Sequence, residues 1–259
     1  MIEALAQIAP MGVTALWTGF VVFIRIGAMM ALVPAFGEQN VPMRVRLGVT
    51  LAFVLIVLPA APGLPAQPAA SAALTAIILA EAATGLFMGL MLRLFVIALQ
   101  IAGTIAAQST SLSQLFGGST GVDPLPAIGN VLLVAGLALA TLLGLHVRLA
   151  EYMIYSYELI PAGQFPSPAV VSAAGLAEVG HAFALAFTLA APFVIASLIY
   201  NVTLGVINRA MPQLMVSFVG APAITAGGLI LLFVSAPILL SIWVDAFGDF
   251  MIDPFGTLR

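Results

Sequence analysis

Residues 208–222 read Asn-Arg-Ala-Met-Pro-Gln-Leu-Met-Val-Ser-Phe-Val-Gly-Ala-Pro, and they interrupt two of the most apolar runs of the chain, 183–207 and 223–244. Pro212 lacks a backbone donor and clashes with the preceding turn, so it predicts a break or kink in a helix, and Pro222 repeats the interruption. A charge, two amides and two prolines within apolar sequence are tolerated where protein, rather than lipid, surrounds the backbone. The stretch therefore predicts kinked membrane helices that pack against other protein.

The composition predicts the broad class of the protein. Of its 259 residues, 63% are hydrophobic and 7% are charged, and the mean hydropathy is +1.21. These values lie far outside the usual range of soluble domains, so we expect an all-α integral membrane protein with a single domain over residues 1–259. A net charge of −3, with no Lys, argues against a nucleic-acid partner. The absence of Cys excludes disulfides and thiolate metal sites.

Apolar runs give the expected positions of the helices. The run that begins at residue 45 is short for a full span and ends in a Pro-rich connector. Residues 127–145 predict a clean span, and the tyrosines that follow it, Tyr152, Tyr155 and Tyr157, are typical of a membrane interface. Prolines at 192 and 237 predict kinks. The six runs lie at about 11–36, 45–62, 73–107, 126–157, 174–207 and 213–248.

The third run is too long for one simple crossing. A helix over residues 73–107 would measure about 50 Å at 1.5 Å per residue, whereas the hydrocarbon core is about 30 Å thick. Either the helix breaks near Gly103, or it continues beyond the bilayer among partner proteins.

A row of small and charged residues lies within this run. Glu81, Gly85, Gly89 and Arg93 follow one another at four-residue steps, which predicts a small-residue groove for close helix contact. Glu81 and Arg93 are three turns apart and cannot pair directly. Two roles remain open for Glu81, namely packing with a hydrogen-bonded partner and carrying protons.

Arg25 is the one charge in the first spanning run, residues 11–33. An arginine at the bilayer centre costs roughly 2.5–3.5 kcal/mol on the insertion scale. Either Arg25 reaches toward the nearer interface, or it contacts a buried partner.

A polar segment, residues 108–126, is the polar gap of the N-terminal half of the chain. Its hydroxyl, amide and glycine residues are not tolerated in lipid as an irregular loop, but they can line a water-filled lumen. On composition alone, a loop at the membrane surface is the plainer interpretation. The residues of interest are Gln108, Ser111, Leu115, Phe116, Gly117, Gly118, Asp123 and Pro124.

The stretch at 208–222 resembles a motif of the FliR family of flagellar biosynthesis proteins, which has counterparts in virulence secretion systems. The matching residues are Asn208, Arg209, Pro212, Gln213, Gly220 and Pro222. Further similarity includes Val33-Pro34, Phe36-Gly37, Glu81, the segment from Gln108 to Pro124, and Gly144 with His146. An ordered series over roughly residues 20–240 makes the resemblance specific.

The resemblance implies a fold of tilted helical hairpins within a hetero-oligomeric assembly. FliP-like and FliQ-like subunits would form with this chain an export channel, beside FlhA-like and FlhB-like components. Unfolded flagellar proteins would cross the bacterial inner membrane there, at the flagellar basal body, with lipid as a further contact. The segment at 108–124 would help to close the pore, with Leu115 and Phe116 at its apolar tip.

An enzymatic function is not expected from these residues. His146 and His181 lie in different segments without a Ser-His or Asp-His arrangement, so no catalytic residue, cofactor or metal site is predicted. Two alternatives stay open. Broken helices and intramembrane charges are also typical of a secondary transporter for a small solute, and the equivalent subunit of a virulence secretion system would show the same motif.

Overall fold

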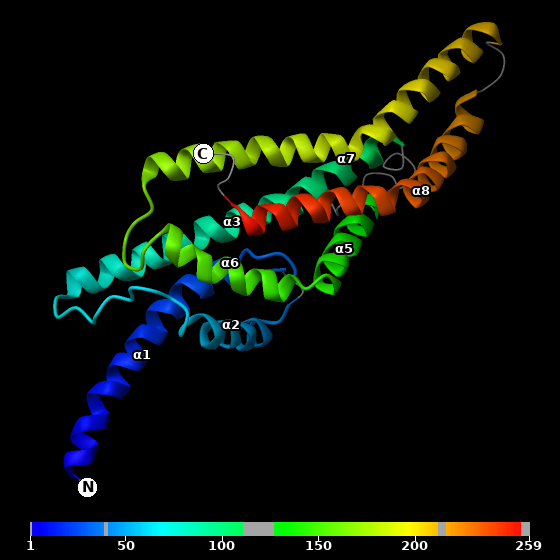
Figure 1. Cartoon of the computed structure of the whole chain (residues 1–259). Helices are drawn as coiled ribbons and strands as arrows, with labels where there is room; N and C mark the ends of the chain where they lie inside the picture. The colour runs from blue at the N-terminus through cyan, green and yellow to red at the C-terminus, as the bar shows by residue number, and fades with distance from the viewer. Residues whose placement is uncertain (1, 39–40, 111–126, 212–215, 255–259) are drawn as a thin grey trace. The chain divides into compact units, whose positions relative to one another are not determined.

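The computed structural model describes residues 2–38, 41–110, 127–211 and 216–254. Over these ranges the chain forms helices and no strand, which confirms the all-α prediction (Figure 1). The helices are α1 (Ile2–Met30), α2 (Met43–Val57), α3 (Ser71–Ser109), α5 (Ala127–Leu142), α6 (Leu145–Leu159), α7 (Pro168–Ala210) and α8 (Val216–Ile252).

The long helices are apolar enough to cross a membrane. Four such stretches lie among the described residues, and α5 with α6 makes a fifth if this broken pair is counted as one span. The helix α2 has 15 residues, which is short of the roughly 20 that a crossing needs. The chain is an integral membrane protein. The four stretches are Gly12–Met30, Ser71–Ser109, Pro168–Ala210 and Pro222–Ile252.

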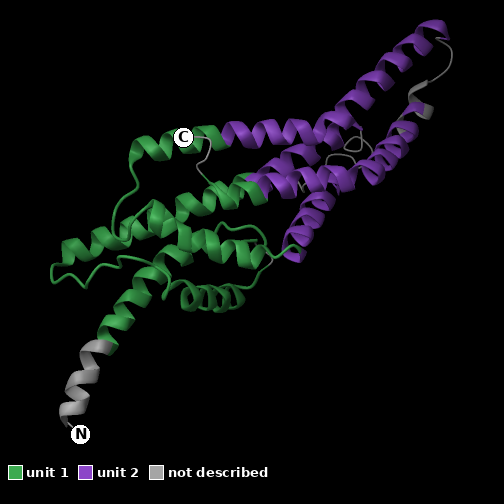
Figure 2. Ribbon diagram, in the orientation of Figure 1, with its two compact units in different colours: residues 1–94, 143–178, 248–259 green, residues 95–142, 179–247 purple. Residues whose placement is uncertain are grey.

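The chain divides into two compact units, which Figure 2 shows in separate colours. Unit 1 consists of residues 1–94, 143–178 and 248–259, and unit 2 consists of residues 95–142 and 179–247. The helices α3, α7 and α8 contribute residues to both units. The prediction of a single domain over 1–259 stays a prediction.

The helix α3 is continuous through Gly103, so the alternative in which it breaks there is wrong. Its 39 residues correspond to about 58 Å at 1.5 Å per residue, against a hydrocarbon thickness of about 30 Å. Gly103 serves packing instead, because a Cβ atom at this position would lie 2.1 Å from the Cα atom of Gly129 in α5. The missing side chain lets the two backbones touch.

Three prolines lie inside the long helices α7 and α8 and do not end them. Of the two outcomes predicted, a break does not occur at Pro222, because Pro222 lies inside α8, as Pro237 does, and Pro192 lies inside α7. Each proline removes one hydrogen bond of the ladder, which a membrane helix tolerates when its neighbouring turns and packing partners remain in place. Figure 1 shows α7 and α8 changing direction along their length, as kinks of this kind require.

The predicted span at 127–145 is shorter than expected. The helix α5 ends at Leu142, and Gly144 precedes α6 with a φ of +88°, a left-handed backbone that glycine adopts without steric cost. The tyrosines of α6 do not form an interfacial belt, since Tyr152 and Tyr157 are 0% and 2% exposed. That interpretation is wrong for these two residues because α6 is a separate helix that packs them into the interior of unit 1.

Unit 2 has an aromatic core around Trp243 of α8, which is fully buried. The indole Nε1 of Trp243 donates a hydrogen bond of 2.8 Å to the backbone oxygen of Phe95 in α3. Its ring stacks on Phe247, with 5.2 Å between the ring centroids. A Cβ atom at Gly136 of α5 would lie 3.5 Å from the indole ring and 2.7 Å from Leu99. Through the contacts of Trp243, this core joins α3, α5 and α8 within unit 2.

Alanine at position 103 and alanine at position 129 form a matched test of the backbone contact in unit 2. A Cβ atom at 103 would lie 2.1 Å from Gly129, whereas a Cβ atom at 129 would have no neighbour closer than 3.7 Å. We expect Gly103→Ala to lower the stability by roughly 1–3 kcal/mol through overpacking, and Gly129→Ala to be neutral or stabilising. The thermal unfolding midpoint in detergent, measured on the protein within its purified membrane assembly, tests both variants, and equal effects would contradict the contact.

Candidate functional site

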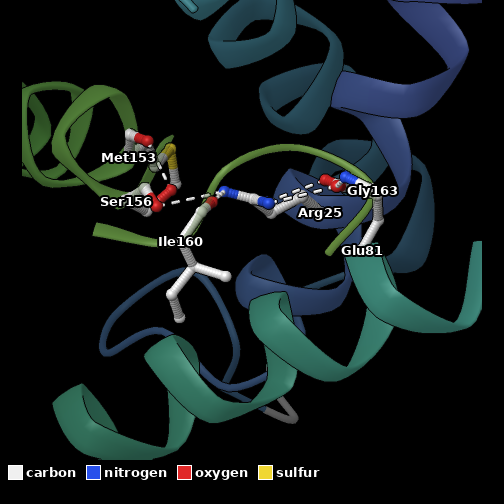
Figure 3. A network of polar contacts seen from close by, with 6 residues as sticks. All are labelled: Arg25, Glu81, Met153, Ser156, Ile160 and Gly163. Atoms are coloured by element: carbon white, nitrogen blue, oxygen red, sulfur yellow. Dashed lines mark hydrogen bonds and ion pairs between the residues drawn. The ribbon is translucent and has the colours of Figure 1, made fainter. Parts of the chain in front are cut away.

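An ion pair with no solvent exposure lies in unit 1, between Arg25 of α1 and Glu81 of α3. The Nε atom of Arg25 donates to Oε2 of Glu81 at 2.8 Å, and Nη2 donates to Oε1 at 3.1 Å. This bidentate arrangement, drawn in Figure 3, is the strongest geometry that an arginine and a carboxylate can form. Of the two roles expected for Arg25, the structure shows the buried partner contact.

The third guanidinium nitrogen binds the end of α6. Nη1 of Arg25 donates to the backbone oxygens of Ser156 at 3.1 Å and Ile160 at 2.9 Å. These carbonyls belong to the last turn and the C-terminal cap of α6, where the helix dipole favours a cation. The Ser156 carbonyl accepts from Arg25 in addition to its bond from the backbone N–H of Ile160. The ring of Tyr157 lies 3.9 Å from the guanidinium carbon, a cation–π contact.

The carboxylate of Glu81 also holds the connector between α6 and α7. The backbone N–H of Gly163 donates to Oε1 of Glu81 at 2.6 Å, as Figure 3 shows. Gly163 has a φ of +77°, in the left-handed region that favours glycine. The pair therefore joins four segments of unit 1, namely α1, α3, the end of α6 and the turn at Gly163.

The sequence positions this pair through the small-residue row of α3. A Cβ atom at Gly85 would lie 2.2 Å from the backbone oxygen of Arg25, and one at Gly89 would lie 2.8 Å from the backbone oxygen of Met29. Only glycine admits so close an approach of two helices. The expected groove is thus present, and α1 occupies it. Because the backbones are in contact, the side chain of Arg25 lies within reach of Glu81.

The two buried charges have partners for their polar atoms. Removing an unpaired ion from water costs several kcal/mol, and a buried pair recovers this cost only with good geometry and further hydrogen bonds. Here the donors of Arg25 reach Glu81 and two carbonyls, and the carboxylate accepts from Arg25 and Gly163. Such an arrangement holds segments together. Whether Glu81 also carries protons stays a prediction.

The other charge of the α3 row has a different partner. Nη1 of Arg93 lies 2.5 Å from Oε1 of Glu38, with about a quarter of each side chain or less exposed. Arg46 of α2 donates to the backbone oxygens of Phe36 and Glu38. Glu81 and Arg93 therefore do not pair with each other, as their spacing predicts, and the second pair fixes the connector between α1 and α2.

The polar segment predicted to close the pore lies largely outside the described residues. Gln108 is in the last turn of α3, and Thr110 follows that helix. Ser111, Leu115, Phe116, Gly117, Gly118, Asp123 and Pro124 lie outside the described residues. The second part of α3, from residue 95, and α5 flank the segment and belong to unit 2, where Gly103 and Gly129 place α3 against α5. Both anchors of the segment are therefore close to one helix contact.

The motif residues flank the connection between α7 and α8. Asn208 and Arg209 are in the last turn of α7, and both are exposed, whereas Gly220 is buried in α8. The hydroxyl of Tyr200 donates to the backbone oxygen of Gly220 at 2.5 Å, and a Cβ atom at Gly220 would lie 2.8 Å from that hydroxyl. The glycine of the motif thus admits Tyr200. Pro222 lies in α8, and Pro212 and Gln213 lie outside the described residues.

Several partners of the ion pair carry no signal in the sequence. Ser156, Ile160 and Gly163 contribute backbone atoms, and any residue type supplies a backbone carbonyl. The one available sign was Gly163 itself, since a glycine in a Pro-Ala-Gly connector can mark a left-handed turn. Tyr200 was missed because an isolated tyrosine in an apolar helix has no distinctive spacing.

Long apolar helices joined by a buried ion pair and by glycine contacts define a helical membrane protein that packs through polar links and small residues. A family model described as bacterial export proteins, family 1, matches residues 16–250 of the chain. The protein belongs to this family of bacterial export proteins.

Three relatives show the extent of the similarity, and each is named flagellar biosynthetic protein FliR. The protein of Caulobacter vibrioides is 30% identical over 238 residues, which cover 89% of this chain and 92% of the relative. The protein of Bacillus subtilis is 28% identical, over 87% of this chain and 88% of the relative. The Escherichia coli protein is 26% identical, over 83% of each chain.

Removing one member of the buried pair should destabilise the protein far more than removing one member of an exposed pair. Arg25→Gln leaves the carboxylate of Glu81 buried without its partner, at a cost of roughly 3–5 kcal/mol. Arg148 and Glu151 of α6 form a pair with side chains 50% and 58% exposed, so we expect Arg148→Gln to change stability by less than about 1 kcal/mol. The yield and thermal stability in detergent of the membrane assembly that contains each variant are the measurements. A stable Arg25→Gln protein would contradict the role of the pair.

Proposed function

We propose that this protein is a subunit of the flagellar protein export apparatus in the bacterial inner membrane. It forms, with FliP-like and FliQ-like subunits and beside FlhA-like and FlhB-like components, the channel through which unfolded flagellar proteins pass. The observation that carries this proposal is the family match over residues 16–250. Relatives named flagellar biosynthetic protein FliR support it over 83–92% of their own length.

The exposed apolar surface of unit 2 supports a place within a larger assembly. Large apolar side chains on α7 and α8 are exposed, for example Leu198 (64% exposed) and Phe233 (84% exposed). At 43 residues, α7 exceeds the length that a bilayer can cover by itself. The apolar surface beyond the bilayer needs protein partners, and a multi-subunit channel provides them.

The alternatives receive less support. A secondary transporter for a small solute is not favoured, because the family consists of export proteins. The relatives described above carry a flagellar name, which favours flagellar use over the equivalent role in a virulence secretion system. An enzymatic step is not part of the proposal.

The segment at 108–124 acts in this proposal as the closure of the channel. Leu115 and Phe116 are its large apolar residues between Leu112 and Val122, and an apolar constriction across a narrow lumen excludes water and ions. The anchors of the segment, at the end of α3 and the start of α5, are held in unit 2 through Gly103 and Gly129. Anchors held in place at both ends, together with glycines within the segment, would allow the segment to close the channel and to move aside when substrate enters.

The residues Asn208, Arg209, Pro212, Gln213, Gly220 and Pro222 act in assembly under the same proposal. Those with described side chains at the end of α7 are exposed. An exposed amide and guanidinium at the end of an apolar helix offer hydrogen bonds to a neighbouring subunit.

Co-expression tests the assembly on which this function depends. With FliP-like and FliQ-like subunits from the same bacterium, we expect a discrete complex, because the partners cover the open apolar surface of α7 and α8. Expression of the chain alone should give aggregation or degradation. Mass measurement of the affinity-purified material distinguishes the two results, and a monodisperse, thermally stable monomer would count against the proposal.

Removal of residues 115–121 tests the closing segment. We expect the complex to assemble but to conduct small ions, because the apolar constriction is lost. Phe116→Asp should produce a milder leak by wetting the constriction, whereas Phe116→Leu, the matched control, should stay closed. Ion conductance of planar bilayers containing the complex is the measurement. If the deletion complex assembles and conducts no more than the parent, the segment is an ordinary surface loop.

A further inference from the structure

The contact between α1 and α3 in unit 1 is made by two rows with the same repeat. Gly85 faces Arg25 and Ala28, and Gly89 faces Met29 and Leu32. The residue numbers rise together on the two helices, so α1 and α3 run side by side in the same direction. Each row advances by four residues, close to one turn of helix.

Such a contact by itself does not fix how far α1 slides along α3. Glycine has no side chain to interlock with a neighbour, and it accepts any backbone that approaches it. A slip of one turn would place Gly89 opposite the backbone of Arg25 in place of Gly85. Val21, which is also buried, would then face Gly85, so both glycines would still have a helix backbone beside them.

The ion pair, in contrast, exists in one register only. A slip of one turn moves the guanidinium by about 5.4 Å along the axis, whereas its bonds to Glu81 measure 2.8 and 3.1 Å. The same slip breaks the bonds of Arg25 to Ser156 and Ile160. Two charges with no solvent exposure would then lack partners, which apolar surroundings do not tolerate.

We propose that Arg25 and Glu81 are positioning residues that set the axial register of α1 on α3. The glycine groove supplies close contact, and the ion pair selects one position along it. Because Gly163 and Ile160 bind the same two side chains, the selected register also positions the connector from α6 to α7. This role is independent of the export function.

The chain contains no cysteine, so spin labels at two introduced cysteines report the register without background. Leu16 of α1 and Leu90 of α3 are 77% and 44% exposed. They lie at different heights along the helix pair, so a slip of one turn changes their separation by about 5 Å. The measurement is the distance distribution between labels in Leu16→Cys/Leu90→Cys, in the co-expressed complex purified in detergent.

The first variant replaces both charges by apolar residues, Arg25→Met with Glu81→Met. We expect folded protein with a second distance population displaced by about one turn, or about 5 Å. The control, Arg148→Met with Glu151→Met, removes an ion pair within α6, and it should keep the single parental distance. An unchanged single distance in the first variant would overturn the proposal. Failure of that variant to fold would also overturn it, since the pair would then provide stability rather than register.

The second variant moves the arginine by one turn, as Arg25→Met with Met29→Arg, and keeps Glu81. The relocated guanidinium reaches Glu81 only if α1 slides by one turn toward its own N-terminus. The whole distribution between positions 16 and 90 should therefore lengthen by about 5 Å. Retention of the parental distance, or loss of the folded protein, would contradict the proposal, because the shifted register would then not be available.

Discussion

A guanidinium in apolar surroundings needs a partner for its charge and acceptors for its N–H groups, and this requirement organises unit 1. The side chain of Arg25 reaches a carboxylate in α3 and two carbonyls at the end of α6. The carboxylate in turn holds Gly163. Segments far apart in sequence are therefore joined at one point by bonds that lipid cannot replace. The identity of the partners, more than the apolar surface, decides which segments meet there.

Association of helices in lipid cannot rely on the hydrophobic effect, because lipid tails are as apolar as the side chains. The protein meets this constraint in each unit by close backbone contact at glycine combined with a polar link. In unit 1 the glycines are Gly85 and Gly89, and the link is the ion pair. In unit 2, Gly103 touches Gly129, and the indole of Trp243 binds the backbone of Phe95. The two units thus use the same means with different residues.

The sequence was sufficient for the helical class, the Pro-rich connector after α2, the groove at Gly85 and Gly89, and the family. It was insufficient where backbone atoms decide the structure. Apolar sequence looks the same on either side of Gly103, so whether this glycine breaks the helix or packs it depends on Gly129 in another helix. The tyrosines of α6 have the composition of an interface, yet burial of Tyr152 depends on segments distant in sequence. Pro222 was interpreted as an interruption because proline often ends a helix, and the sequence alone does not show whether the helix continues through it.

The order of the chain within unit 1 has a consequence for its synthesis. The ribosome makes the Arg25 and Glu81 helices first, but residues 143–178 and 248–259 of the same unit emerge much later. Phe250, from the last of these segments, lies 6.2 Å from Tyr152 between ring centroids. Translation must therefore pass through all of unit 2 before unit 1 is whole. During that interval the early helices lack the late segments that complete their unit, and incompletely covered apolar surface of this kind is prone to misassembly.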